Sequence, residues 1–139
     1  MQMSVEENKQ VVRDYFSASA VGDLARLDQL IADDATRWMI PSTPFSGVAN
    51  KAEMMAAFEA VSGASDEPFG NEVEHITAED NRVSVTATSY LKLRSGKVYA
   101  NQYHFLFFVE NGKITSIKEY FDTAHFNEIF TPEEMAKLG

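Results

Sequence analysis

The spacing of hydrophobic residues changes from a helical to a strand period near the middle of the chain. Three stretches between residues 5 and 63 repeat apolar residues at the spacing of one helix face. Capping patterns at Ser4 and Asn50 and an N-cap at Asp23 mark the starts of the three predicted helices. From about residue 71 onward the period falls to two, which is typical of β-strands.

The strand-like half of the chain predicts an antiparallel meander. Strands are expected over 73–77 and 83–93, followed by a long hairpin over 97–122 that turns at Asn111-Gly112. This dipeptide tolerates the positive φ that a type I′ turn requires at both central positions. A short edge strand is also expected over 35–40, and the prolines that follow it predict an irregular loop.

The order of these elements predicts an α+β fold, because three helices precede the strands instead of alternating with them. The first strand of the hairpin is apolar on both faces, so both faces of the sheet should be covered. Helices packed on the concave face of a coiled antiparallel sheet would enclose an apolar-walled hollow. A second copy of the chain is expected to cover the convex face, which predicts a homodimer.

Composition removes several classes of function. The net charge of −9, without a Lys/Arg cluster, argues against a nucleic-acid partner, and no apolar run approaches the ~18 residues of a membrane span. The absence of cysteine fits a reducing cytoplasm. The three histidines lack metal-ligand spacing, and no Gly-rich phosphate loop is present. We therefore expect a soluble cytoplasmic protein that uses neither metal nor cofactor and binds no membrane.

Two stretches of the sequence resemble a known family. They are GDLARLDQLIADDATRW at 22–38 and YANQYHFLFFVENGKITSIKEYFDT at 99–123, and they resemble the SnoaL-like polyketide cyclases of the nuclear transport factor 2 superfamily. Ketosteroid isomerases, limonene epoxide hydrolases and scytalone dehydratases share that superfamily. The resemblance implies a cone-shaped α+β barrel with one pocket, usually dimeric. We expect a single domain over 1–139, with a core of about 5–125 and a C-terminal tail that begins a short helix near Thr131.

Asp122 is the first candidate for catalysis, because it closes the last strand where SnoaL-like cyclases place a cavity carboxylate. At the mouth of an apolar hollow its pKa should rise, which suits proton transfer at carbon. Alternatively, Asp122 caps the turn that follows it. If Asp122 faces outward, Glu119 inherits the role, because it points to the other face of the strand. His125 either pairs with Asp122 as an acid–base couple or is a solvated turn residue.

The strand before it supplies candidate pocket residues. Tyr99, Asn101 and Tyr103 share one face, which favours a wall that holds a carbonyl or hydroxyl. The alternative is that the tyrosines fill the core and Asn101 bonds to the backbone. His104 alternates to the convex side. Further hydrogen-bond donors and apolar lining residues are expected from the rest of the chain, namely Tyr15, Trp38, Met39, Phe45, Met54, Phe58, Tyr90 and Phe105.

These residues predict a cofactor-free acid–base enzyme of the isomerase, cyclase or dehydratase type, acting on a small hydrophobic carbonyl or ring compound. Two departures from the superfamily argue against its other activities. The long strand lacks the arginine of an epoxide hydrolase, and the segment around Trp38 lacks the base of a ketosteroid isomerase. A non-catalytic module that binds a hydrophobic metabolite and a protein-interaction domain are the alternatives.

Overall fold

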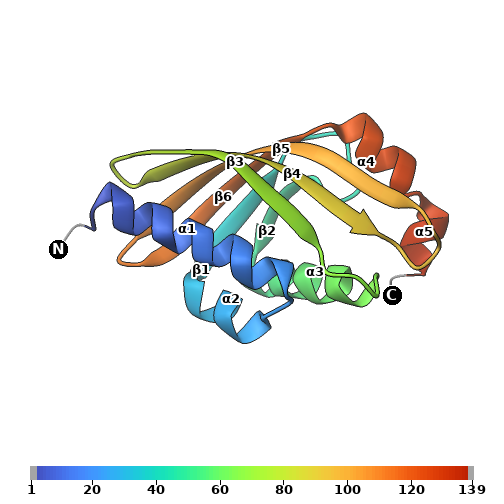
Figure 1. Ribbon diagram of the computed structural model, residues 1–139, viewed down its shortest axis with the longest axis horizontal. Helices are drawn as coiled ribbons and strands as arrows, with labels where there is room; N and C mark the ends of the chain where they lie inside the picture. The colour runs from blue at the N-terminus through green and yellow to red at the C-terminus, as the bar shows by residue number, and fades with distance from the viewer. Residues whose placement is uncertain (1–2, 138–139) are drawn as a thin grey trace.

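The computed structural model describes residues 3–137, in which three helices lie in the first half of the chain and four strands follow the third of them, all within one six-stranded sheet (Figure 1). The α+β prediction is confirmed, while the first two and last two residues of the predicted domain lie outside the described range. The elements are α1 (Val5–Ala20), α2 (Leu24–Leu30), β1 (Ile31–Met39), β2 (Gly47–Asn50), α3 (Lys51–Gly63), β3 (Gly70–Glu79), β4 (Arg82–Lys92), β5 (Val98–Glu110), β6 (Lys113–Phe121), α4 (Thr123–Ile129) and α5 (Pro132–Ala136).

Local sequence signals account for the starts of the helices and for the central turn. Ser4 and Asn50 each form a reciprocal capping box with the glutamate three residues later, which satisfies amide groups that the first helical turn leaves free. Asn111 and Gly112 both have positive φ, at 52° and 77°, as a type I′ turn requires. Thr131 caps α5, the short helix predicted in the tail. None of the helices within residues 3–137 is long and apolar enough to span a membrane.

The sheet is mixed rather than wholly antiparallel, which corrects one expectation. Its strand order is β2-β1-β6-β5-β4-β3, and β1 pairs with β6 in parallel while the other neighbours are antiparallel. Most of the chain lies between β1 and β6, and so long a connection permits a parallel pair. The predicted loop also contains β2, a four-residue strand too short to show a periodic pattern.

The core lies between the helices and the inner face of the sheet. In Figure 1, α1 runs across the strands, and it contacts β3, β4, β5 and β6, while α3 contacts β1. Phe107 is fully buried at the centre, with its ring centroid 5.2 Å from that of Tyr15 and 5.7 Å from that of Phe16. The alternation of side chains along β5 therefore directs Tyr103, Phe105 and Phe107 toward the helices and Phe108 to the other face.

Residues after the last strand form a helix where only a turn was predicted. Phe126 and Ile129 of α4, with Phe130, pack on Tyr99 and Leu91 in a second apolar cluster at the end of β4 and β5. A seven-residue helix offers too few turns for a helical period to stand out in the sequence. Helix α4 thereby adds a wall that the sequence pattern had not indicated.

Candidate functional site

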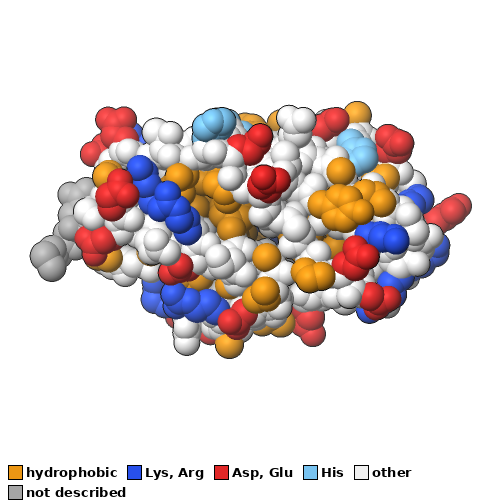
Figure 2. Space-filling view, viewed as in Figure 1, with side chains coloured by type: hydrophobic (Ala, Val, Ile, Leu, Met, Phe, Trp, Pro, Cys, Tyr) orange, Lys and Arg blue, Asp and Glu red, His pale blue; other side chains and the backbone are white. Residues whose placement is uncertain are grey.

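A cavity of about 840 Å³ lies between the inner face of the sheet and the helices. Its lining comes from α1, β1, α3, β5 and β6 and from the aromatic residues of and after α4. Figure 2 shows hydrophobic side chains gathered in a hollow of the viewed face, with charged side chains between them and along the outline. A volume of this size matches the range of about 300–1,000 Å³ typical of small-molecule sites.

Glu119 and Arg37 bring opposite charges into this apolar cavity. Glu119 projects inward from β6, opposite Phe105 of β5, and Arg37 projects inward from β1 beside Met39. Arg37 Nε lies 3.3 Å from Glu119 Oε2, and the two side chains are only 14% and 13% exposed. The N–H is not directed at the oxygen, so both buried atoms lack a hydrogen bond among the described residues despite their ionic contact.

The environment of Glu119 shifts its acidity. Desolvation raises the pKa of Glu119 above the ordinary value of 4.5, and the positive charge of Arg37 opposes this rise in part. A carboxyl group with a raised pKa exchanges its proton closer to neutral pH, which is the requirement for general acid–base catalysis. Glu119 therefore has the burial, the position and the acidity that the sequence analysis expected of a cavity carboxylate.

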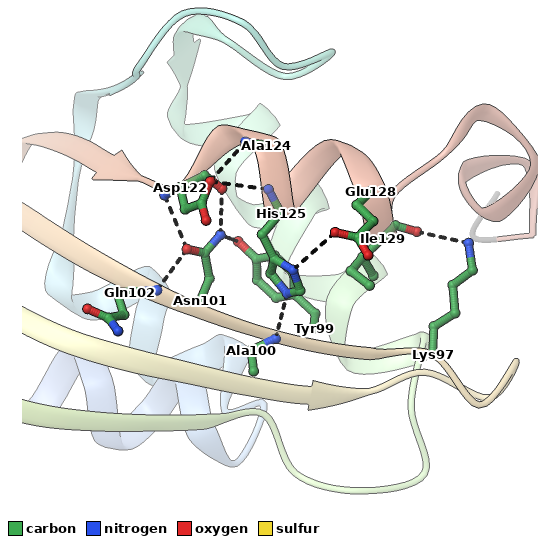
Figure 3. Close-up of polar contacts among 10 residues, drawn as sticks. All are labelled: Lys97, Tyr99, Ala100, Asn101, Gln102, Asp122, Ala124, His125, Glu128 and Ile129. Carbon is green, nitrogen blue, oxygen red and sulfur yellow. Dashed lines mark hydrogen bonds and ion pairs between the residues drawn. The ribbon is translucent and has the colours of Figure 1, made fainter.

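Asp122 instead has the capping role. Its side chain is exposed, and Oδ1 accepts hydrogen bonds from the backbone N–H groups of Ala124 at 3.0 Å and His125 at 3.2 Å, at the start of α4 (Figure 3). It is not among the residues that line the cavity. The structure thus follows the alternative in which Asp122 caps the next segment and Glu119 faces inward.

His125 anchors α4 rather than pairing with the Asp122 carboxylate. Its Nε2 accepts a hydrogen bond from the Ala100 backbone N–H at 3.1 Å, and its ring stacks on Tyr99 with centroids 5.5 Å apart (Figure 3). The Nδ1 atom lies 4.0 Å from a carboxylate oxygen of Glu128. The ring therefore contributes to the wall behind Tyr99, and the predicted acid–base couple does not form.

Asn101, Tyr99 and Tyr103 form one hydrogen-bonded group. Asn101 is 4% exposed, and its Nδ2 donates to the Tyr99 hydroxyl at 2.9 Å, while the Tyr99 and Tyr103 hydroxyls bond to each other. Burial raises the pKa of Tyr99 to about 12 and raises that of Tyr103 well above its ordinary value. Both phenols therefore remain protonated, and both line the cavity.

Most of the other residues predicted to line the pocket do so. Tyr15, Met39, Phe45, Phe58 and Phe105 line the cavity.

Three predicted residues lie elsewhere. Met54 is fully buried in the core, Tyr90 is 47% exposed, and Trp38 packs against Tyr120, 5.3 Å away between ring centroids, on the outer face. Trp38 and Tyr90 point to the outer face, because successive strand residues point to opposite faces and their neighbours Met39 and Leu91 point into the cavity.

Arg37, Phe126 and Phe130 line the cavity but were not predicted as site residues. Arg37 shares the inward face of its strand with Met39, and this parity was readable from the sequence. Phe126 and Phe130 could not be assigned, because they depend on a helix that the sequence pattern did not indicate. Within residues 3–137, no cluster of three or more histidine or acidic side chains is placed to hold a metal ion.

Solved structures with the same fold include Bal32a from a soil-derived mobile gene cassette, at a TM-score of 0.82 and 22% identity over 91% of this chain and 98% of that one. A nuclear transport factor 2-like protein from Burkholderia xenovorans is 27% identical over 91% of this chain and 98% of its own, with a TM-score of 0.76. An epoxide hydrolase of M. tuberculosis, described as limonene-epoxide-hydrolase-like, is 19% identical over 96% of each chain, with a TM-score of 0.74.

No curated protein matches the sequence of this chain. A family model described as a SnoaL-like domain matches residues 12–117, which is most of the chain and includes β1, β5 and the start of β6. The chain therefore belongs to the SnoaL-like domain family.

Proposed function

We propose that this protein is a cofactor-free acid–base enzyme of the isomerase, cyclase or dehydratase type, acting on a small hydrophobic carbonyl or ring compound. Glu119 moves the proton, in the role first considered for Asp122. The observation that carries this proposal is a carboxyl group with a raised pKa, buried in an apolar cavity beside an arginine that does not satisfy it by a hydrogen bond.

Arg37 supports proton transfer by keeping the charge of the cavity balanced. Before reaction, the guanidinium of Arg37 neutralises the carboxylate of Glu119. When Glu119 takes a proton from a carbon next to a carbonyl, the negative charge passes to the oxygen of the substrate, and Arg37 loses its anionic partner. The guanidinium then stabilises the enolate, and this attraction is strong because the surroundings exclude water.

The alternative is a module that binds a hydrophobic metabolite without reaction. The mutual neutralisation of Arg37 and Glu119 favours it, since a paired carboxylate can serve structure alone. Deuterium exchange separates the two functions. In D₂O, the enzyme should catalyse saturable exchange of the protons next to the carbonyl of 2-tetralone, followed by proton NMR. Saturable binding of 2-tetralone without faster exchange would favour the binding module.

Replacing Arg37 with methionine should raise the pKa of Glu119 further. The charge of Arg37 lowers the pKa of Glu119 and desolvation raises it, so removal of Arg37 leaves only the effect that raises it. The base form of Glu119 then becomes populated only at higher pH, and the rising limb of the exchange rate should move to higher pH. The measurement is the pH dependence of 2-tetralone exchange together with a ¹³C NMR titration of the Glu119 carboxyl.

The matched control for this variant is Arg82→Met. Arg82 is half-exposed and lies 3.8 Å from Asp80, at the turn between β3 and β4. Its replacement should leave the pH profile in place. A profile that stays unchanged in Arg37→Met would show that Arg37 does not act on the proton-transferring group.

We also propose that the protein is a homodimer that packs through the outer face of the sheet. Four apolar side chains on this face stay accessible, with Val48 at 69%, Tyr90 at 47%, and Val98 and Tyr120 each at 37% exposure. Trp38 and Lys118 pack beside Tyr120 and extend the same surface. An accessible apolar patch on a pleated sheet suits a self-complementary interface.

Sedimentation velocity tests the dimer. The parent protein should sediment as a dimer, and Tyr120→Asp should shift it toward monomer, because a carboxylate would be buried against its own copy in the interface. Val5→Asp places the same charge on a partly exposed position of α1 and should leave the dimer intact. A monomeric parent protein would refute this assembly and favour a different partner for the outer face.

A further inference from the structure

Three residues at one end of the cavity form a chain of polar groups that begins at Asn101 and ends at Tyr103. We infer that Asn101 sets the direction of the hydrogen bonds through Tyr99, so that Tyr103 offers a proton to the cavity and selects ligands carrying an acceptor oxygen there. The class of ligand is a carbonyl compound or an ether. This inference rests on the proposed function in one respect, because it takes the cavity as the ligand site.

Backbone groups fix the orientation of the Asn101 amide. Its Oδ1 accepts from the backbone N–H groups of Gln102 at 2.7 Å and Asp122 at 3.1 Å, and its Nδ2 donates to the backbone oxygen of Asp122 at 2.9 Å (Figure 3). A backbone N–H can only donate and a backbone carbonyl can only accept. The amide therefore cannot turn over, and its remaining N–H must be the donor to Tyr99.

The direction continues from Tyr99 to Tyr103. A tyrosine hydroxyl carries a single proton, and the Tyr99 oxygen already accepts from Asn101. The Tyr99 proton therefore goes to the Tyr103 oxygen, its other hydrogen-bond partner. The reverse order would leave the Tyr99 proton without an acceptor among residues 3–137. That side chain is 2% exposed and packed against the rings of His125 and Phe130.

The proton of Tyr103 is then the one left for a ligand. Tyr103 lines the cavity, and among the described residues its hydroxyl bonds to Tyr99 alone. Tyr103 pairs with Phe121 and Phe105 pairs with Glu119, so Tyr103 and Glu119 are diagonal neighbours on the inner face. Diagonal neighbours lie roughly 7–8 Å apart at the backbone. A ligand held at Tyr103 would thus share the cavity with Glu119.

Asn101→Asp tests the direction, because it changes a donor to an acceptor at nearly constant shape. One oxygen of the new carboxylate still accepts from the two backbone N–H groups. The other oxygen has no proton for the backbone oxygen of Asp122, so that hydrogen bond is lost, and it can only accept from Tyr99. The chain then reverses, and Tyr103 presents lone pairs instead of a proton. Binding of 2-acetylnaphthalene, which only accepts, should weaken about 2- to 12-fold relative to 2-naphthol, which can donate. Fluorescence titration at pH 8 measures the affinities of both compounds.

Three comparisons make this test decisive. Asn81→Asp adds the same charge at the turn between β3 and β4 and should leave the ratio of the two affinities unchanged. If Asn101→Asp does not fold, as judged by thermal unfolding, Tyr103→Phe should produce the same relative loss of 2-acetylnaphthalene while binding of naphthalene stays constant. The inference would be overturned by an unchanged ratio of the 2-acetylnaphthalene and 2-naphthol affinities in the folded Asn101→Asp protein. An unchanged ratio of the 2-acetylnaphthalene and naphthalene affinities in Tyr103→Phe would also overturn it.

The outcome is independent of proton transfer by Glu119. Both probes are compared by affinity alone, so a protein without exchange activity still gives a clear result. Conversely, an unchanged ratio would leave the Glu119 proposal in place and remove only the role of Asn101 and Tyr103 in selecting the ligand.

Discussion

Replacing Glu119 with glutamine is expected to slow the exchange of 2-tetralone protons in D₂O by about 10²–10⁴-fold, the usual contribution of a positioned acid or base. Glutamine keeps the size and the polarity of the side chain but cannot take up a proton. The side chain should therefore keep its place beside Arg37 while the reaction stops. Binding of 2-tetralone should change much less than its exchange rate.

Asp122→Asn is the matched control for this experiment. It makes the same carboxyl-to-amide change three residues further along, where the side chain is exposed and caps α4. Asparagine is as good an N-cap as aspartate, so both stability and exchange should stay close to those of the parent protein. Loss of exchange in Asp122→Asn together with an active Glu119→Gln protein would assign the chemistry to Asp122 and refute the proposed mechanism.

Replacing Phe107 with alanine is expected to lower the free energy of unfolding by about 3–5 kcal/mol, the usual range for such a truncation in a core. Phe107 is 0% exposed, and its ring contacts those of Tyr15, Phe16 and Phe105, so no neighbour can easily fill the space it leaves. For a domain of this size the loss corresponds to a fall of about 10–20 °C in melting temperature. Urea unfolding and calorimetry measure the two quantities.

Phe45→Ala removes the same atoms from a ring that is 43% exposed at the edge of the cavity. Because much of that ring is already in water, its loss should cost less than about 1 kcal/mol. Equal losses of stability for the two variants would contradict the assignment of the core to the inner face of β5. A small loss for Phe107→Ala would mean that the helices repack against the sheet after truncation.

The strand parities of the hairpin were readable from the sequence. Alternation along 97–122 placed Tyr99, Asn101 and Tyr103 on one face, and placed Glu119 and Asp122 on opposite faces of the last strand. Asn111-Gly112 located the turn, because few residues accept positive φ at both central positions. The family resemblance, which was expected to place Asp122 in the cavity, pointed to the outward-facing acid.

The helix that begins after Asp122 explains why the expectation of a cavity carboxylate at this position was wrong. A carboxylate at the end of a strand can face a cavity or cap the next element, and the two uses leave the same residue in the sequence. Only the formation of α4, packed through Phe126 and Ile129 on the second apolar cluster, commits the Asp122 side chain to backbone amides. Long-range packing, rather than local propensity, stabilises so short a helix.

By itself, the sequence determined the first three helices, the hairpin, the capped starts of those helices and the face on which each hairpin residue lies, because these depend on local spacing and backbone conformation. Tertiary structure decided which strands are neighbours. The parallel pairing of β1 with β6 brings Arg37 to Glu119, although the two residues are far apart along the chain. A local sequence pattern cannot predict that contact, because the order of strands in a sheet depends on which arrangement buries the apolar faces of all the strands together.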